Sequence, residues 1–303
     1  MKTKTNSNKR WRPSSTRCGI SRRPGRRSKS HSKTGYAADP VDVDSANEAL
    51  RMALGTLNPV YFAREFLGFN PDAAQERVLN GAVGHRRIAL NCNRQWGKST
   101  VAAILAVHRL VTHPGVTVLI VAPSGRQSGE TLRKVAGFLG ILGIGTVGDG
   151  VNRAAIVLPN GSRIVSLPAV DATVRGFSAV SMLIVDEASR VPDAVYLALR
   201  PALAVSGGDI VLVSTPNGRR GFFYREMSGM EKRTGEGWLR HTGPVAECGA
   251  RVPAEFIEEE RARGESYFRQ EYLCEFIETG RYLFDEELVH SIVKRELEAF
   301  TWI

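Results

Sequence analysis

Short apolar runs alternate along this chain with an apolar helical segment, and this alternation limits the possible folds most strongly. Arg87–Asn91 (RIALN) and Val116–Ala122 (VTVLIVA) have apolar residues at successive positions, as expected of strands buried on both faces. Lys98–Thr112 lies between them and has the composition of an apolar helix. Met182–Val185 and Ile210–Val213 provide two further buried strands. The pattern predicts an α/β fold, with a mostly parallel sheet covered by helices.

Length and composition exclude several classes of protein. The 303 residues suffice for one large or two modest domains with a substantial core. The chain is 43% hydrophobic and 24% charged, and no apolar run approaches the roughly 18 residues needed to span a bilayer. We therefore expect no membrane association. The four cysteines, Cys18, Cys92, Cys248 and Cys274, form neither a CxxC pair nor a disulfide framework, which favours a reducing cytosol.

The net charge of +10 comes from the N-terminal region. Residues 1–38 contain 12 Lys and Arg residues and no acid, whereas the rest of the chain carries 29 cations and 31 acids. We expect a disordered basic tail over residues 1–45 that could hold double-stranded DNA through its phosphates. A solvated arm without a role and an upstream start codon, with Met52 as the true start, remain open, and a mitochondrial transit peptide ranks lowest.

The chain after this tail divides into two expected parts. A core over residues 46–236 begins with two short helices, at residues 60–67 and Gln75–Val83, and contains a hairpin at 154–167. Asn160-Gly161 between two apolar runs is the strongest local signal for that hairpin. Residues 237–303 form a small linker or lid subdomain, mainly helical over Pro253–Phe276.

A first chemical motif joins the strand at residues 87–91 to the helix that follows. It reads Asn93, Arg94, Gln95, Trp96, Gly97, Lys98, Ser99 and Thr100. Between a strand and a helix, such a Gly-Lys-Ser sequence predicts a phosphate-binding loop, in which backbone N–H groups and the helix dipole hold phosphate oxygens. Lys98 would contact the β- and γ-phosphates, and Ser99 would ligate Mg²⁺. The match is atypical, because Cys92 stands where the motif has its first Gly.

A second motif places two carboxylates after a buried strand. Asp186 and Glu187 follow Met182–Val185, and ligands of open α/β sheets bind at the carboxyl ends of the strands. Asp186 would hold Mg²⁺ and Glu187 would orient and deprotonate an attacking water. The alternative is a strand leading into an acidic helix N-terminus.

A third motif ends the strand at Ile210–Val213 with Ser214 and Thr215. If that strand lies beside the phosphate-binding strand, these hydroxyls could sense the γ-phosphate. A simple turn begun by Pro216-Asn217-Gly218 is equally compatible.

Together these motifs resemble the large terminase subunit of tailed bacteriophages, over roughly residues 55–285. Besides the three segments above, the resemblance rests on Phe69-Asn70-Pro71 to Gln75, Thr173-Val174-Arg175-Gly176 and Gly221-Phe222-Phe223-Tyr224. It implies a RecA-like P-loop NTPase core, plus a small helical C-terminal subdomain, ATP and Mg²⁺ as cofactors, and translocation of double-stranded DNA into a procapsid.

The resemblance also implies roles for individual residues. Gln75 matches an adenine-recognising glutamine, although the usual aromatic residue before it is Ala74 here. Arg94 and Arg175 are the two candidates for an arginine finger that stabilises charge on the transferring phosphoryl group. Ser214 and Thr215 match the motif that couples hydrolysis to movement.

The implied partners are double-stranded DNA, the portal protein, the small terminase subunit and further copies in a homo-oligomeric ring, in the host cell cytoplasm. Large terminases usually continue into a nuclease domain with clustered metal-binding acids. This chain has 27 residues after Phe276, and their acids resemble a solvated helix face. We therefore expect no DNA cleavage by this chain alone, with the nuclease either on another polypeptide or lost.

Two other functions stay open from the sequence. A helicase or another translocase would need a second RecA-like lobe, for which the sequence has no room. A non-catalytic DNA- or capsid-binding protein with a degenerate nucleotide site would agree with Cys92 at the first glycine position.

Overall fold

A computed structural model describes residues 43–148, 154–170, 176–229 and 237–278. The expected basic tail, except for its last residues, and the arginine-finger candidate Arg175 lie outside these ranges. Within them, no helix combines the length and the apolar character that crossing a bilayer requires.

A seven-stranded sheet forms the centre of the molecule, in the order β3-β4-β2-β5-β6-β1-β7. All neighbouring strands are parallel except the β3–β4 pair. The strands are β1 (Arg87–Cys92), β2 (Thr117–Ala122), β3 (Ala155–Val157), β4 (Arg163–Pro168), β5 (Val180–Asp186), β6 (Asp209–Ser214) and β7 (Trp238–Gly243). The buried runs of the sequence thus form the parallel part, as predicted.

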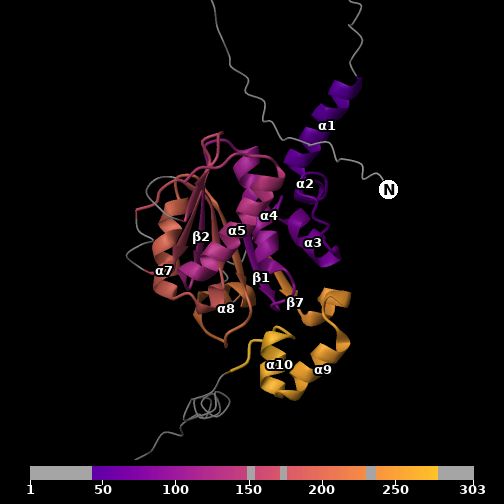
Figure 1. Cartoon of the computed structure of the whole chain (residues 1–303). Helices are drawn as coiled ribbons and strands as arrows, with labels where there is room; N and C mark the ends of the chain where they lie inside the picture. Colours follow the sequence, from indigo (N-terminus) through magenta and orange to yellow (C-terminus); the bar gives the residue numbers. More distant parts are fainter. Residues whose placement is uncertain (1–42, 149–153, 171–175, 230–236, 279–303) are drawn as a thin grey trace, which may run out of the picture.

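Helices cover both faces of this sheet, which explains why its strands are apolar at successive positions (Figure 1). Ile120 and Ile184 pack into a core with α4 (Lys98–Thr112) and α5 (Gly125–Ile141). Their neighbours in the strands, Leu119 and Leu183, face the opposite way. They pack with α7 (Asp193–Leu199) and α8 (Gly221–Ser228).

Three N-terminal helices extend the α4 side of the core. They are α1 (Val43–Leu57), α2 (Pro59–Glu65) and α3 (Ala73–Gly81). Phe62 and Leu79 of α2 and α3 are fully buried in that core, which confirms the two helices predicted here. Asp72 caps α3 by accepting hydrogen bonds from the N–H groups of Ala74 and Gln75. Most of α1 is exposed and projects away from the sheet (Figure 1).

The predicted hairpin at residues 154–167 is confirmed. β3 and β4 pair antiparallel, with Ile156 opposite Ile164. Gly161 turns the chain at a φ of +81°, a value that favours glycine. The Asn160 side chain donates to the Leu110 carbonyl and fixes the turn against α4.

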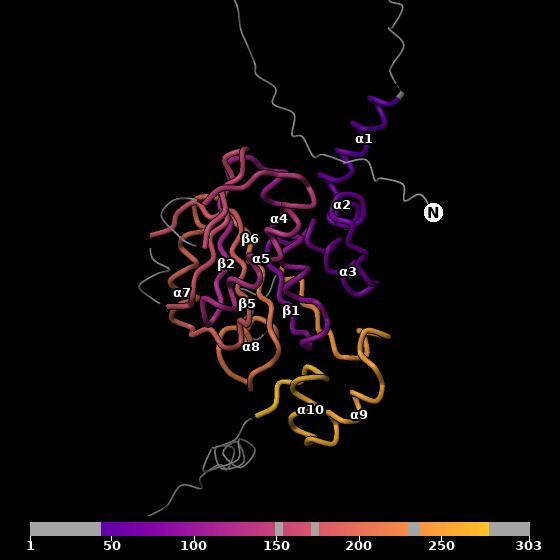
Figure 2. Tube along the Cα trace, in the orientation of Figure 1, coloured from indigo at the N-terminus to yellow at the C-terminus, as the bar shows by residue number. Residues whose placement is uncertain are grey.

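The sheet continues past residue 236, where we expected the core to end. β7 pairs in parallel with β1 along its whole length, from Arg87–Trp238 to Cys92–Gly243. Only after this edge strand does the chain form a small helical group, with the 3-10 turn η3 (Val245–Arg251), α9 (Ala254–Ala262) and α10 (Glu265–Glu271). The trace places α9 and α10 together, beyond β1 and β7 (Figure 2).

Candidate nucleotide-binding site

The strand order brings the three predicted motifs to one edge of the sheet. β6 pairs with β1 on one side and with β5 on the other, and all three run parallel. Their carboxyl ends carry Ser214-Thr215, the predicted phosphate-binding loop and Asp186-Glu187, in the order β6, β1 and β5. The condition set from the sequence, that β6 lies beside the phosphate-binding strand, is therefore confirmed.

The loop after β1 presents the N-terminus of α4 without a capping side chain. Gly97 is the N-cap residue and adopts a left-handed conformation with φ 91°. A Cβ atom at this position would approach the Gln75 amide nitrogen to 2.8 Å, so both conformation and space favour glycine. Lys98 begins α4 and is buried. The first N–H groups of the helix and this ammonium form a cationic end suited to phosphate oxygens.

Cys92 and Asn93 replace the usual glycine turn at the start of this loop. Cys92 ends β1 fully buried, and burial raises the pKa of its thiol well above the usual value, so it packs as an unreactive apolar residue. The buried Asn93 side chain donates to the Gly243 carbonyl at 3.0 Å and accepts from the Gln95 N–H at 2.8 Å. Loss of the first glycine therefore leaves a turn that a side-chain amide closes.

Asp186 lies at the centre of the polar edge, with both carboxylate oxygens engaged. The Ser99 hydroxyl is 3.5 Å from Oδ1, and the Glu187 N–H donates to the same oxygen at 3.0 Å. Thr131 of α5 donates to Oδ2 at 2.6 Å. These contacts orient the carboxylate toward Ser99, and a hydroxyl with a carboxylate is a hard oxygen pair of the kind Mg²⁺ prefers.

Glu187 adopts a strained backbone conformation beside Lys98. Its φ of 51° lies in the left-handed region, which a residue with a Cβ atom occupies at a cost of about 1–3 kcal/mol. Its Oε1 is 3.7 Å from Lys98 Nζ, and its Oε2 accepts from Arg190 at 2.9 Å. The carboxylate is thus turned toward the phosphate-binding lysine.

Ser214 and Thr215 contact the turn that follows Glu187. Ser214 Oγ donates to Ser189 Oγ at 2.8 Å and accepts from the Ser189 N–H at 3.1 Å. Thr215 Oγ1 accepts from Arg190 at 3.0 Å. The end of β6 is therefore linked by hydrogen bonds to the segment that carries Glu187.

Arg94, the described arginine-finger candidate, pairs with an acid of the C-terminal helical group. Its Nε donates to Glu271 Oε2 of α10 at 3.0 Å. The Arg94 side chain is 70% exposed, whereas that of Glu271 is 8% exposed. Glu271 counteracts the effect of burial and raises the pKa of Arg94.

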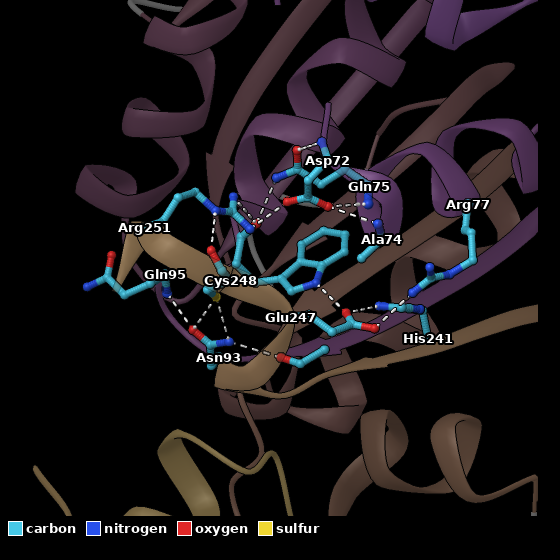
Figure 3. Close-up of polar contacts among 12 residues, drawn as sticks. Asp72, Ala74, Gln75, Arg77, Asn93, Gln95, His241, Glu247, Cys248 and Arg251 are labelled. Carbon is cyan, nitrogen blue, oxygen red and sulfur yellow. Dashed lines mark hydrogen bonds and ion pairs between the residues drawn. The ribbon is translucent and has the colours of Figure 1, made fainter. Parts of the chain in front are cut away.

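Gln75 supports the loop from the side of α3. Its Oε1 accepts from the Asp72 N–H at 3.1 Å, which completes a capping box, and its Nε2 donates to the Trp96 carbonyl at 2.8 Å. Arg251 of η3 donates to the same carbonyl at 3.2 Å and pairs with Asp72 (Figure 3). Two side chains distant in sequence therefore fix the carbonyl that precedes Gly97.

The Trp96 side chain does not face the cationic end of α4. It is fully buried, and its Nε1 donates to Glu247 Oε2 at 2.8 Å. His241 of β7 and Arg77 of α3 contact the same carboxylate at 2.8 and 3.0 Å (Figure 3). A Cβ atom at Gly243 would come within 2.5 Å of the indole, so β7 must carry glycine where it passes the loop.

The structure thus separates the predicted site residues into two groups. One group faces the edge where β5 and β6 end; it contains Lys98, Ser99, Asp186, Glu187, Ser214 and Thr215. The other shapes the loop behind it and includes Gln75, Asn93, Gln95 and Trp96. Thr100 continues α4 through its N–H bond to the Gly97 carbonyl.

Sequence reasoning missed three polar residues that contact the first group. Thr131 and Glu271 reach the site from α5 and α10, and no local pattern connects them to it. Arg190 had a signal, because its spacing of three residues from Glu187 places the two side chains on one side of a 3-10 turn.

Comparison with known proteins adds a family to this geometry. The family described as "Terminase large subunit, T4likevirus-type, N-terminal" matches residues 92–290, about two thirds of the chain. The chain belongs to the terminase large subunit family. This terminase chain is 28% identical to the large subunit of Escherichia phage T5 over 224 residues, covering 72% of the chain and 50% of the relative. It is 26% identical to that of Thermus phage G20c over 251 residues, covering 73% and 51%. The chain spans about half the length of these curated relatives.

Solved structures confirm the predicted RecA-like α/β fold of the terminase chain. The large terminase ATPase domain of Thermus phage P74-26 has a TM-score of 0.64 at 23% identity, covering 73% of this chain and all of that one. The large terminase of bacteriophage HK97 has a TM-score of 0.61 at 16% identity, covering 73% and 55%. The large terminase of a thermophilic bacteriophage, solved in complex with ADP, has a TM-score of 0.59 at 12% identity, covering 68% and 53%.

Proposed function

We propose that this chain is the ATP-hydrolysing motor part of a viral DNA-packaging terminase. One observation carries the proposal: Lys98 faces Glu187 at 3.7 Å while Ser99 faces Asp186 at 3.5 Å, where α4 begins. A cation, a hydroxyl and two carboxylates meeting at a helix N-terminus match the needs of triphosphate hydrolysis. The ADP complex of the large terminase from the thermophilic bacteriophage supports an adenine nucleotide as the ligand.

Each side chain has a separate task in this proposal. Lys98 and the N–H groups of α4 bind the β- and γ-phosphates. Glu187 accepts a hydrogen bond from the attacking water, orients it and takes its proton. Arg94 stabilises negative charge on the phosphoryl group after it leaves Glu271. Arg175 remains a second candidate for that role.

Mg²⁺ fits the donor set at Ser99 and Asp186. In NTPases this ion usually keeps several waters and is held by one or two protein oxygens together with substrate phosphates. A hydroxyl and one carboxylate supply that number of protein oxygens, 3.5 Å apart. When bound, the ion would neutralise charge on the β- and γ-phosphate oxygens.

The links from β6 support a coupling role for Ser214 and Thr215. Both reach the turn that holds Glu187, through Ser189 and Arg190. A change at the catalytic carboxylate would therefore be transmitted to the end of β6 and to the segment after it.

The proposed partners follow from the family. They are double-stranded DNA, the portal protein, the small terminase subunit and further copies of this chain in a ring on the procapsid, in the host cell cytoplasm. A nuclease would come from elsewhere in the packaging machinery. The basic tail at residues 1–45 would contribute phosphate contacts to DNA.

The test is ATP hydrolysis by the purified chain with and without double-stranded DNA, for the unchanged protein and for Glu187→Gln. We expect Glu187→Gln to lower kcat by roughly 100- to 10,000-fold, because it removes a general base. Affinity for a fluorescent ATP analogue should stay within a fewfold. Glu76→Gln is the matched control, since Glu76 is also half-buried and paired with an arginine, Arg64. Absence of hydrolysis and of nucleotide binding in the unchanged protein would favour the non-catalytic alternative.

A further inference from the structure

Arg190 connects the predicted catalytic carboxylate to two other parts of the molecule. It ends the short 3-10 turn η1 (Ala188–Arg190) that directly follows Glu187. In a 3-10 turn, side chains three residues apart lie one above the other, which places the guanidinium over the Glu187 carboxylate. The Arg190 side chain is 31% exposed and that of Glu187 is 22% exposed, so water screens their interaction only in part.

One nitrogen of Arg190 makes two contacts. Its NH1 donates to Glu187 Oε2 at 2.9 Å and to Thr215 Oγ1 at 3.0 Å. A guanidinium is planar and always charged, so these two acceptors fix its orientation as well as its position. The carboxylate that would activate water is therefore held by the same group that contacts the end of β6.

The other nitrogen of Arg190 faces α10. NH2 is 3.6 Å from Glu271 Oε1, while the second oxygen of Glu271 accepts from Arg94 of the phosphate-binding loop. Glu271 is nearly buried, and such a carboxylate is expensive to leave without a cationic partner. It therefore anchors the far side of the Arg190 guanidinium and directs NH1 toward Glu187.

We propose that Arg190 is a positioning residue for the Glu187 carboxylate, and that Glu271 of α10 acts on hydrolysis through Arg190. This inference rests on the proposed function, because it assumes that Glu187 is the base. It gives the C-terminal helical group a defined influence on the chemical step. A shift of α10 away from the sheet would release Arg190 and let the carboxylate turn away from its working orientation.

The first test compares Arg190→Gln and Arg190→Lys with the unchanged protein in steady-state ATP hydrolysis. Arg190→Gln should lower kcat about 10- to 100-fold, the loss expected when a charge-assisted hydrogen bond to a reacting group is removed. KM and the affinity for a fluorescent ATP analogue should change less than about threefold. Arg190→Lys keeps the charge but only one donor point, and should recover part of the lost kcat.

Arg225→Gln is the matched control. Arg225 donates to the Asp193 carboxylate at 2.7 Å and has a side-chain exposure of 39%, similar to that of Arg190. Its variant should keep kcat in the absence of DNA. Thr215→Val, which removes one acceptor while keeping the side-chain shape, provides a milder second variant with an expected fewfold loss of kcat. It decides the question if Arg190→Gln fails to fold.

The second test is a double-mutant cycle between Glu271 and Arg190. Glu271→Gln should lower kcat about three- to tenfold in the unchanged background and have little further effect when Arg190 is already Gln. An undiminished effect of Glu271→Gln in the Arg190→Gln background would overturn the link from α10. Unchanged kcat in Arg190→Gln, together with hydrolysis that still depends on Glu187, would overturn the positioning role and leave the proposed function intact.

Discussion

The two ends of the parallel strands use the same residue types to opposite effect. At the carboxyl ends, Lys98 is buried 3.7 Å from Glu187, whose backbone lies in a left-handed conformation. At the amino ends, Asp209 of β6 is paired with both Arg86 and Arg109. The first arrangement holds charges that a ligand would stabilise, whereas the second satisfies its charges within the protein. Function and stability are thus located at opposite edges of one sheet.

The amino-terminal edge joins three elements through ion pairs. Asp209 has a side-chain exposure of 13%; Arg109 reaches it from α4, and Arg86 Nε lies 3.4 Å away just before β1. Arg87 adds a bond from NH1 to the Gly208 carbonyl at 2.8 Å. These contacts fix how α4 lies against β6 and therefore help to set the direction in which α4 presents its N-terminus at the other edge.

The largest expected effect is loss of activity in Lys98→Met. Removal of the ammonium should lower ATP hydrolysis by roughly 100- to 1,000-fold or more, because preorganised positive charge at the phosphates is lost. The free energy of unfolding should stay the same or rise, since a buried charge with a distant partner stabilises little. Hydrolysis rates and urea unfolding of the same sample check both parts. Strong destabilisation by Lys98→Met would remove the contrast between the two edges.

The opposite result is expected for Asp209→Asn. Two arginines lose their carboxylate, and we expect the free energy of unfolding to fall by about 2–3 kcal/mol, less than for a fully buried pair because Arg86 is largely exposed. The kcat of the folded fraction should stay within about twofold. Urea unfolding gives the stability, with Glu130→Gln as a control for the exposed Glu130–Arg133 pair. A large fall in kcat at full folding would show that the amino-terminal edge takes part in catalysis.

The smallest expected effect is a pH dependence of stability through His108. Burial lowers the pKa of this α4 histidine to about 4, and its Nε2 bonds to the Gly55 carbonyl at 3.1 Å. The unfolded chain takes up a proton near pH 6.5, before the folded chain does, so stability falls as the pH decreases toward 4. Between pH 7 and pH 5 we expect a loss of about 2 kcal/mol.

Urea unfolding at both pH values measures this loss. His108→Gln serves as the comparison, because it keeps a polar side chain without a titratable ring. An equal loss in the variant would assign the pH dependence to other groups.

The sequence predicted the order of strands and motifs better than the contacts between them. Asp186, Glu187 and Lys98 could be placed because each follows a buried run or begins an apolar helix, and parallel strands bring such ends to one edge. The antiparallel β3–β4 pair was predicted for a similar reason, since Asn160-Gly161 is a local signal. These features depend on residues close together in the chain.

Contacts that depend on long-range packing could not be predicted. β7 reads as part of a polar, mixed segment, and only its pairing with β1 shows that it belongs to the sheet. Trp96 was assigned to nucleotide binding because of its place in the motif, but its indole faces Glu247, His241 and Gly243. Glu271 lies 177 residues from Arg94, and no periodicity links them.

The position of β1 between β6 and β7 has a consequence for synthesis of the protein. β1 is made early, yet both strands that flank it come from residues 209–243. On the ribosome, the phosphate-binding loop must wait for more than a hundred later residues before its supporting strand gains either neighbour. A chain released before that point would expose two unpaired edges of an apolar strand, an invitation to aggregation and a substrate for chaperones.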